Sequence, residues 1–199
     1  MVPEAASGTD ADARWRLFVA LPLTEAVRDA LERPLEPYRE AFPAAGWLDP
    51  LSWHVTLLFL GHVPAVQVPA LDSACASVAA SWPAFEVGVS RGGGRSRHET
   101  GVAWLRVRLG ARRVIELAEY LDRAVRCVPI GGAQPRRAPS AHVTVARRAE
   151  VALLRALELE ALGSLGVGWQ VDRVHLVRSH LEADGARYEV LRDAPLSGA

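Results

Sequence analysis

The residues of this chain best suited to chemistry are two histidines, each followed two positions later by a threonine. His54-Val55-Thr56 is repeated as His142-Val143-Thr144, 88 positions further on. With six histidines and five threonines among 199 residues, random placement predicts only roughly 0.15 such triplets in the chain. Two copies therefore indicate that both sites share one role.

Each motif has the alternation of a β-strand. In a strand, the histidine and the threonine of one motif lie on the same face, about 7 Å apart. The apolar residues between and after them then point to the opposite face, where they can be buried: Val55, Leu57 and Phe59 in the first copy, Val143 and Val145 in the second. Each strand would thus present one imidazole and one hydroxyl above an apolar underside.

The sequence around the motifs repeats with the same offset. Each half has the pattern strand, helix, motif strand, helix, strand, over residues of about 15–90 and 101–178. This duplication predicts an α+β fold with two similar lobes, in which two antiparallel-rich sheets face each other across a central cleft and helices cover the outer faces. We expect a single bilobal domain over 14–193, with a disordered tail at 1–13 and another tail at 194–199. An ordinary α+β domain with an accidental repeat is the alternative.

Periodicity and breaker residues place the individual elements. Besides the two motif strands, strands are expected at 15–21, 85–89, 102–109, 171–178 and 187–191. Helices are expected at 24–40, 66–80, 112–128 and 151–162, the first interrupted by Pro34 and Pro37. The segment 91–97, with sequence RGGGRSR, reads as a flexible basic loop, and 129–139 as a loop rich in Gly and Pro.

Two lobes of this kind would let the polar faces of the motif strands meet in one concave site, together with Arg147. Such a set suits metal-free cleavage of a phosphodiester, in which one imidazole removes a proton and the other, as imidazolium, protonates the leaving oxygen. The threonine hydroxyls and the guanidinium can bind the nonbridging phosphate oxygens. A metal site is the competing use of two histidines. No acidic residue lies within the motifs and no third histidine has ligand spacing, so we expect no metal.

Composition restricts the remaining functions. The chain has 23 basic and 23 acidic residues, so a polyanion must be bound by a local patch and not by a broad basic face. All the basic residues are arginines, which excludes lysyl-adenylate, Schiff-base and Gly-Lys-Ser/Thr P-loop chemistry. Cys75 and Cys127 have no partner motif and predict reduced thiols in a cytoplasmic protein. No stretch has the length and apolarity of a membrane span or the pattern of a signal peptide.

Taken together, these residues resemble the 2H phosphoesterases, a family defined by two His-x-Thr/Ser motifs. The similarity is greatest to the RNA 2′,3′-cyclic phosphodiesterase branch, whose members are also called 2′-5′ RNA ligases. It rests on Trp47 and on four segments: RLFVAL from residue 16, HVTLLFLG from 54, HVTVAR from 142 and HLVRSHLEADGARYEVL from 175. It covers residues 14–193, almost the whole chain.

The resemblance implies a bilobal fold without metal or other cofactor. It also implies hydrolysis of a 2′,3′-cyclic phosphate at an RNA end to a 2′-phosphomonoester, and joining of RNA ends through a 2′-5′ linkage without ATP. His54 and His142 would be catalytic, and Thr56, Thr144 and Arg147 would bind phosphate. By analogy, His142 would be the base that activates water and His54 the acid on the 3′ oxygen. The sequence itself does not rank the two histidines.

Five further residues are candidate RNA contacts. Trp47 is suited to stack on a base, and four arginines in predicted loops are suited to the RNA backbone: Arg95, Arg97, Arg136 and Arg137. The expected partner is RNA that ends in a 2′,3′-cyclic phosphate, bound by a monomer without a protein partner or a membrane. Two other functions stay open. One is a phosphodiesterase for a small cyclic phosphate or cyclic nucleotide, and the other is an RNA-binding module that has lost catalysis.

Overall fold

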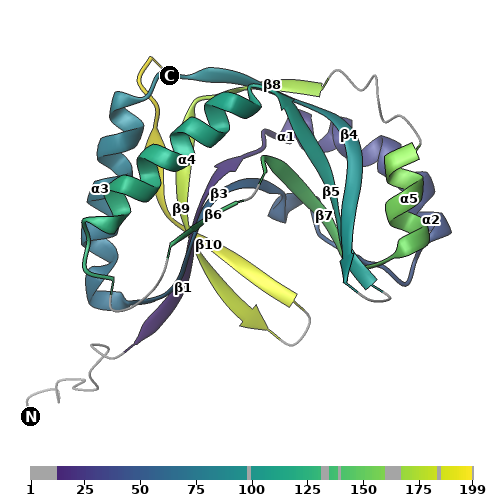
Figure 1. Ribbon diagram of the computed structural model, residues 1–199, viewed down its shortest axis with the longest axis horizontal. Helices are drawn as coiled ribbons and strands as arrows, with labels where there is room; N and C mark the ends of the chain where they lie inside the picture. Colours follow the sequence, from purple (N-terminus) through teal and green to yellow (C-terminus); the bar gives the residue numbers. More distant parts are fainter. Residues whose placement is uncertain are drawn as a thin grey trace, which may run out of the picture.

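A computed structural model describes residues 13–97, 100–130, 135–138, 140–159, 167–182 and 185–198, with the side chains of Ser90, Arg91, Arg97 and Leu159 left undescribed. The tail predicted for 1–13 lies outside the described residues except for Ala13. The α+β class expected from the sequence is confirmed: the fold combines a large antiparallel sheet with a few helices (Figure 1).

The described strands form one ten-stranded sheet with the main order β10-β9-β1-β3-β7-β5-β4-β8. The bounds of these strands are β1 Arg14–Pro22, β3 His54–Pro64, β4 Phe85–Arg97, β5 Thr100–Leu109, β7 His142–Glu150, β8 Val167–Val171, β9 Arg173–Glu182 and β10 Gly185–Pro195. Two short strands lie off this path: β2 (Gly46–Trp47) pairs with β7, and β6 (Arg136–Arg137) pairs with β3.

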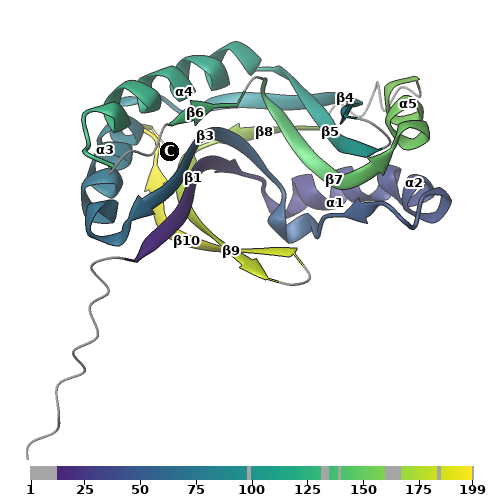
Figure 2. The same cartoon turned by 60° about the horizontal axis from the view of Figure 1, so that its bottom comes forward.

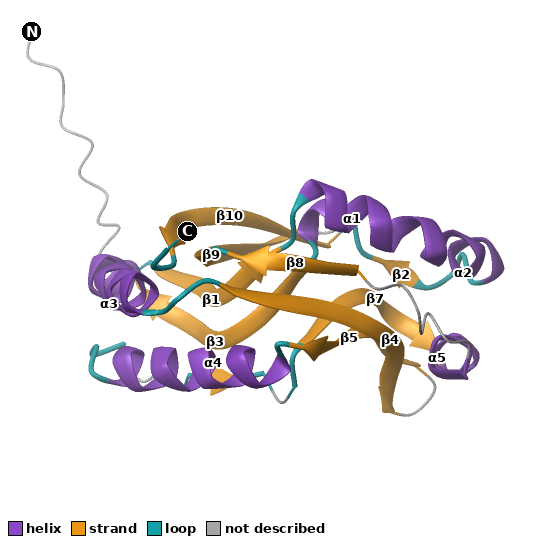
Figure 3. Ribbon diagram, turned by 90° about the horizontal axis from the view of Figure 1, so that it is seen from above, coloured by secondary structure: helices purple, strands orange, loops and turns teal. Residues whose placement is uncertain are grey.

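The helices are α1 (Glu25–Glu32), α2 (Glu36–Ala41), α3 (Val68–Ser81), α4 (Ala111–Arg126) and α5 (Val151–Leu159). Figure 3 shows them at the outside of the strands. Thr24 caps α1 by accepting a hydrogen bond from the backbone N–H of Val27 at 3.3 Å. A 3-10 turn, Arg33–Leu35, separates α1 from α2, as Pro34 predicts, because proline cannot supply the N–H that the helix interior needs.

The two sheets expected from the sequence are the two halves of this single sheet. The motif strands β3 and β7 pair at one register position only, Val55 with Val143. Both valines are fully buried. The valine between the histidine and the threonine of one motif therefore lies against its counterpart in the other, and the two motifs meet at the centre of the molecule.

Each lobe takes elements from both halves of the chain. The strands β10, β9, β1 and β3 form one lobe with α3 and α4, and β7, β5, β4 and β8 form the other with α1 and α5 (Figures 1 and 2). Strand β4 belongs to the first half but pairs with β5, while β9 belongs to the second half but pairs with β1. The sequence repeats and the spatial lobes are therefore not the same units.

The segment 91–97 is part of strand β4, so the prediction of a flexible loop there was wrong. A side-chain carbon on Gly92 would lie 2.5 Å from the carbonyl oxygen of Leu157, and one on Gly94 would overlap the side chain of Leu154. Both leucines belong to α5, which packs directly on the backbone of the strand. The glycines permit this close approach of the helix, and the chain makes no turn there.

The C-terminal residues also differ from the prediction of a tail at 194–199. Strand β10 continues to Pro195, Leu196 is buried, and Ser197 forms a parallel bridge with Pro83. Residues 194–198 thus close the lobe that holds α3. Within the described part of the chain, no helix is long and apolar enough to cross a membrane.

Candidate active site

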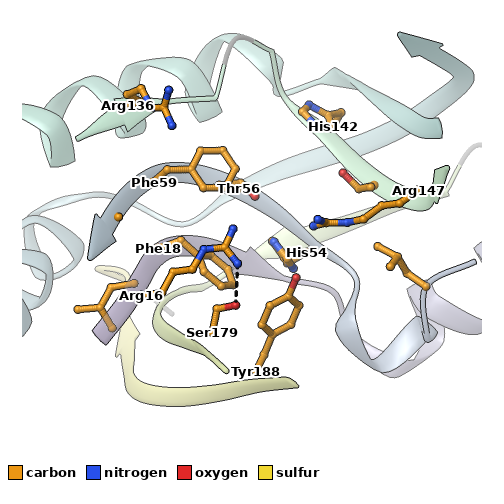
Figure 4. A pocket seen from close by; sticks show the side chains of 14 residues that line it. Arg16, Phe18, His54, Thr56, Phe59, Arg136, His142, Arg147, Ser179 and Tyr188 are labelled. Atoms are coloured by element: carbon orange, nitrogen blue, oxygen red, sulfur yellow. Dashed lines mark hydrogen bonds between the residues drawn. The ribbon is translucent and has the colours of Figure 1, made fainter. Parts of the chain in front are cut away.

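A cavity of about 280 Å³ lies where the two motif strands meet, and both His-x-Thr pairs line it (Figure 4). The five residues that the sequence places in one site all belong to its lining: His54, Thr56, His142, Thr144 and Arg147. The first two come from β3 and the others from β7. Each copy of the motif thus contributes one histidine and one threonine to the cavity, and β7 adds Arg147.

A β-bulge in β3 decides which residues after Thr56 reach the cavity. The pairing of β3 with β1 skips Leu57, so Leu57 and Leu58 are both buried. One extra residue moves the side chains that follow to the other face, until a second skip in the pairing at Leu60. Phe59 consequently lines the cavity with 43% of its surface exposed, and the prediction that it faces the core was wrong.

The second motif strand has the same bulge at the equivalent place. The pairing of β7 with β5 skips Val145, 88 residues after Leu57, and Val145 and Ala146 are both buried. Without this bulge, Arg147 would lie on the buried face. Arg147 is the counterpart of Phe59, so the repeat delivers a guanidinium from one strand and an aromatic ring from the other.

Both imidazoles are held by the same backbone contact. Nδ1 of His54 lies 2.8 Å from the carbonyl oxygen of Ser52, and Nδ1 of His142 lies 2.7 Å from that of Ser140. A carbonyl can only accept a hydrogen bond, so Nδ1 carries the hydrogen and Nε2 is left for proton exchange. The two serines are also 88 residues apart. The repeat is therefore Ser-x-His-x-Thr, a signal that the sequence contained and the sequence analysis did not use.

The imidazole of His54 is enclosed by aromatic rings. It stacks on Phe18 with a centroid distance of 4.8 Å and meets the edge of Tyr188 at 5.4 Å. Burial lowers the pKa of His54 to about 4; the hydrogen bond to Ser52 opposes this shift, and the charge of Arg147 adds to it. His54 is therefore neutral at neutral pH.

The surroundings of His142 are different. Trp104 lies beside its ring at 5.4 Å, and the positively charged Arg106 is close enough to act on it. Burial lowers the pKa of His142 as well, the hydrogen bond to Ser140 opposes this, and Arg106 lowers it further. A bound anion would raise the pKa of both histidines, because negative charge favours the imidazolium form.

Several residues that line the cavity were not found from the sequence. Arg16 lies on β1 and donates from Nη1 to Oγ of the buried Ser179 at 3.2 Å. Phe18 and Tyr188 enclose His54, and Arg16 lies two residues before Phe18, on the same face of its strand. That spacing was the available signal, but only the pairing of β1 with β3 shows which face of β1 is the cavity side.

Of the four predicted RNA contacts whose side chains the structure describes, only Arg136 lines the cavity. Arg137 forms an ion pair with Glu119 at 2.6 Å, and Arg95 is exposed on β4, outside the cavity lining. The side chain of Arg97 lies outside the described residues. Trp47 lines a neighbouring cavity, where its indole N–H donates to the carbonyl of Phe42 at 3.0 Å. Among the described residues, no group of three or more His, Cys, Asp or Glu could hold a metal ion.

Residues 27–183 match the model of the family described as the 2′-5′ RNA ligase superfamily. The chain belongs to this superfamily. The resemblance stated from the two motifs is thus confirmed, over more than three quarters of the sequence.

Individual members of the 2′-5′ RNA ligase superfamily resemble the chain over most of its length. An RNA 2′,3′-cyclic phosphodiesterase of Geobacillus stearothermophilus is 29% identical over 188 residues, which are 94% of this chain; the chain spans only 59% of that relative's length. A protein of the same name from Thermus thermophilus is 33% identical over 195 residues, covering 92% of this chain and 91% of the relative. The crystal structure of TT0787 of T. thermophilus is 30% identical, has a TM-score of 0.75, and matches 92% of this chain and 98% of its own.

Proposed function

We propose that this protein is a hydrolase that opens the 2′,3′-cyclic phosphate at RNA ends, with His54 and His142 as its acid–base pair. The observation that carries the proposal is the meeting of both His-x-Thr motifs in one cavity, each imidazole held through Nδ1. The two relatives named RNA 2′,3′-cyclic phosphodiesterase support the same reaction.

The reaction needs two proton transfers and one displacement at phosphorus. One neutral imidazole accepts a proton at Nε2 from water while the water oxygen attacks the phosphorus. The bond from phosphorus to the 3′ oxygen breaks, and the other histidine, as imidazolium, donates its proton to that oxygen. The products are a 2′-phosphomonoester and a free 3′ hydroxyl.

The remaining motif residues would stabilise the charge on the phosphate. The hydroxyls of Thr56 and Thr144 are suited to donate to nonbridging oxygens, and Arg147 can neutralise the charge that develops there. The resemblance assigns the acid to His54. Since burial lowers the pKa of His54 to about 4, the bound phosphate would have to raise it before this residue can act as an acid.

The test uses an RNA oligonucleotide that ends in a 2′,3′-cyclic phosphate, in the presence of EDTA. We expect the intact protein to form a 2′-phosphate, and His54→Ala and His142→Ala each to lower kcat by roughly a hundredfold or more, the usual contribution of a general acid or base. Phosphorus NMR identifies the product. His180→Ala is the matched control, because His180 pairs with Glu189 at 2.7 Å and is not among the cavity residues.

Two results would contradict the proposal. Opening of a mononucleotide cyclic phosphate but not of RNA would indicate a small-molecule phosphodiesterase, and RNA binding without opening would indicate a binding module.

A substrate with sulfur in place of the bridging 3′ oxygen shows which histidine is the acid and which is the base. A thiolate leaves without protonation, so this substrate restores the activity of the variant that lacks the acid. It does not restore the activity of the variant that lacks the base.

The same pair of histidines would serve ligation, which we include in the proposal. A 5′ hydroxyl in place of water would attack the phosphorus, and loss of the 3′ oxygen would leave a 2′-5′ phosphodiester. The strained cyclic ester supplies the driving force, so no ATP is needed. Joined product from RNA with a cyclic phosphate and a 5′ hydroxyl, absent with either histidine variant, is the expected result.

A further inference from the structure

The cavity contains more positive charge than one cyclic phosphate needs. Three arginines line it, Arg16, Arg136 and Arg147, and no aspartate or glutamate of the described residues does. The chain as a whole has equal numbers of basic and acidic residues. A cyclic phosphate carries one negative charge, which Arg147 alone can balance. The two other guanidinium groups need a separate explanation.

Seven arginines elsewhere in the described chain have a carboxylate partner, and the three described at the cavity do not. The seven are Arg112, Arg126, Arg137, Arg173, Arg178, Arg187 and Arg192. Among the described residues, Arg16, Arg136 and Arg147 have no carboxylate within the 4.0 Å of an ion pair. Arg136 and Arg137 are adjacent, yet only Arg137 has an acidic partner, Glu119. The guanidinium groups at the cavity are thus available to an anionic ligand.

Arg16 is oriented by the protein itself. It is half-buried on β1, and its Nη1 donates a hydrogen bond to Oγ of Ser179. Ser179 is buried, with 7% of its surface exposed. Because the side chain is already held in place, less conformational entropy is lost when a ligand binds. A guanidinium fixed at the wall of a cavity, without a carboxylate, is suited to a phosphate.

Arg16 and Arg136 both lie near Phe59 in the cavity lining (Figure 4). Arg136 pairs with Phe59 through strand β6, and Figure 4 shows Arg16 and Arg136 on either side of the Phe59 ring, away from His142. Arg16 lies two residues from Phe18, about 7 Å along the strand, and the imidazole of His54 stacks on Phe18. Arg147 acts on His54 from the other motif strand. The cavity therefore has guanidinium groups on both sides of His54, Arg147 from the second motif strand and Arg16 with Arg136 beside Phe59 (Figure 4).

We propose that Arg16 and Arg136 bind a second phosphate, the phosphodiester that links the terminal nucleotide to the preceding one. The substrate class is then RNA of two or more nucleotides, in preference to a cyclic mononucleotide. The inference rests on the proposed function, since it places the cyclic phosphate at the histidines.

The test compares three substrates: uridine 2′,3′-cyclic phosphate, the dinucleotide UpU ending in the same cyclic phosphate, and that dinucleotide with an uncharged methylphosphonate linkage. We expect the intact protein to prefer the charged dinucleotide. Arg16→Gln and Arg136→Gln should each lower the ratio of kcat/KM for dinucleotide over mononucleotide about tenfold, the usual size of a lost hydrogen bond to a charged group. The methylphosphonate should lower the ratio at least as much in the intact protein, and it should have a smaller effect in Arg16→Gln, where only Arg136 still contacts the linkage.

Arg137→Gln is the matched control, because it removes the same charge from the neighbouring residue, which faces Glu119. We expect it to leave the ratio unchanged. An equal loss on mononucleotide and dinucleotide in Arg16→Gln, or no effect of the neutral linkage on the intact protein, would overturn the inference while the proposed reaction stands.

A binding measurement separates the inference from the reaction. The affinity for the product dinucleotide with a 2′-phosphate is measured by calorimetry over a range of salt concentrations. Removing one phosphate contact should reduce the slope of log K against log salt by about 0.7. If the intact protein opens neither substrate but Arg16→Gln still reduces this slope, the second phosphate site stands and the proposed reaction fails. An unchanged slope refutes the site.

Discussion

At the scale of the residue, two identical motifs give two different histidines. The difference comes from the neighbouring strands. Phe18 of β1 faces Phe59 in the first lobe, and the residue in the equivalent register of the second lobe is Val102, which faces Arg147. Phe18 stacks on His54, and no such ring exists at Val102. The repeat kept the reactive groups, while the residues that set their environment diverged.

The lowered pKa of His54 predicts a pH-dependent stability. Unfolding restores the usual pKa of about 6.5 to His54. Below that pH, His54 is protonated in the unfolded state but stays neutral in the folded state. Stability is therefore greatest above pH 6.5 and falls as the pH decreases toward about 4, the pKa in the folded protein. From about pH 7 to about pH 5, His54 should account for a loss of about 2 kcal/mol in the free energy of unfolding.

Urea unfolding of the intact protein and of His54→Gln at both pH values measures this contribution. The variant should lose about 2 kcal/mol less than the intact protein over this pH interval. The exposed His62, which lies on the same strand β3, provides the control variant His62→Gln. Equal pH dependence in the intact protein and His54→Gln would contradict a neutral, buried His54.

At the scale of the element, one-residue irregularities and glycines decide what the strands present. The bulges at Leu57 and Val145 turn Phe59 and Arg147 into the cavity. Alternation alone would have buried both residues. On β4, Gly92 and Gly94 let helix α5 lie against the strand backbone, where any side chain would collide.

The close packing of α5 predicts the effect of adding one methyl group. Gly92→Ala should destabilise the protein by about 2 kcal/mol, the usual cost of overpacking, because the new carbon meets the backbone of Leu157. Gly93→Ala is the matched control in the same triplet. The carbon added there would lie 3.3 Å from the indole nitrogen of Trp104, a side chain that can shift. Chemical denaturation should give Gly92→Ala a lower free energy of unfolding than Gly93→Ala. Equal stabilities would refute the close approach of α5 to β4.

At the scale of the whole molecule, the two lobes are interlaced. Strand β4 completes the lobe of the second motif, and β9 completes the lobe of the first. The motif strands share a single paired position, Val55 with Val143. Neither half of the chain can therefore assemble a lobe from its own residues.

This arrangement predicts one cooperative unfolding transition. A chain whose halves formed separate lobes would unfold in two steps, but here each lobe loses a strand when either half unfolds. Calorimetry should give a van't Hoff enthalpy equal to the measured enthalpy. Fragments 13–97 and 100–198, expressed separately, should show no cooperative unfolding. A cooperative transition in either fragment alone would disprove the interlacing.

Much of this fold could be predicted from the sequence because its information is local. The offset of 88, the faces of the motif strands up to Thr56 and Thr144, the cap at Thr24 and the position of each helix follow from periodicity and residue type. The family follows from the same motifs. These features depend on residues that are close together along the chain, so their pattern can be recognised in the sequence.

Only the tertiary structure decided how distant strands pair. That pairing placed β4 and β9 in opposite lobes, introduced the bulges that expose Phe59 and Arg147, and brought Arg16 to the cavity. It also turned the segment RGGGRSR from an expected loop into a strand under α5. A β-bulge and the packing of a helix on a glycine do not change the pattern of apolar and polar residues. Each is fixed by a partner far away in the chain.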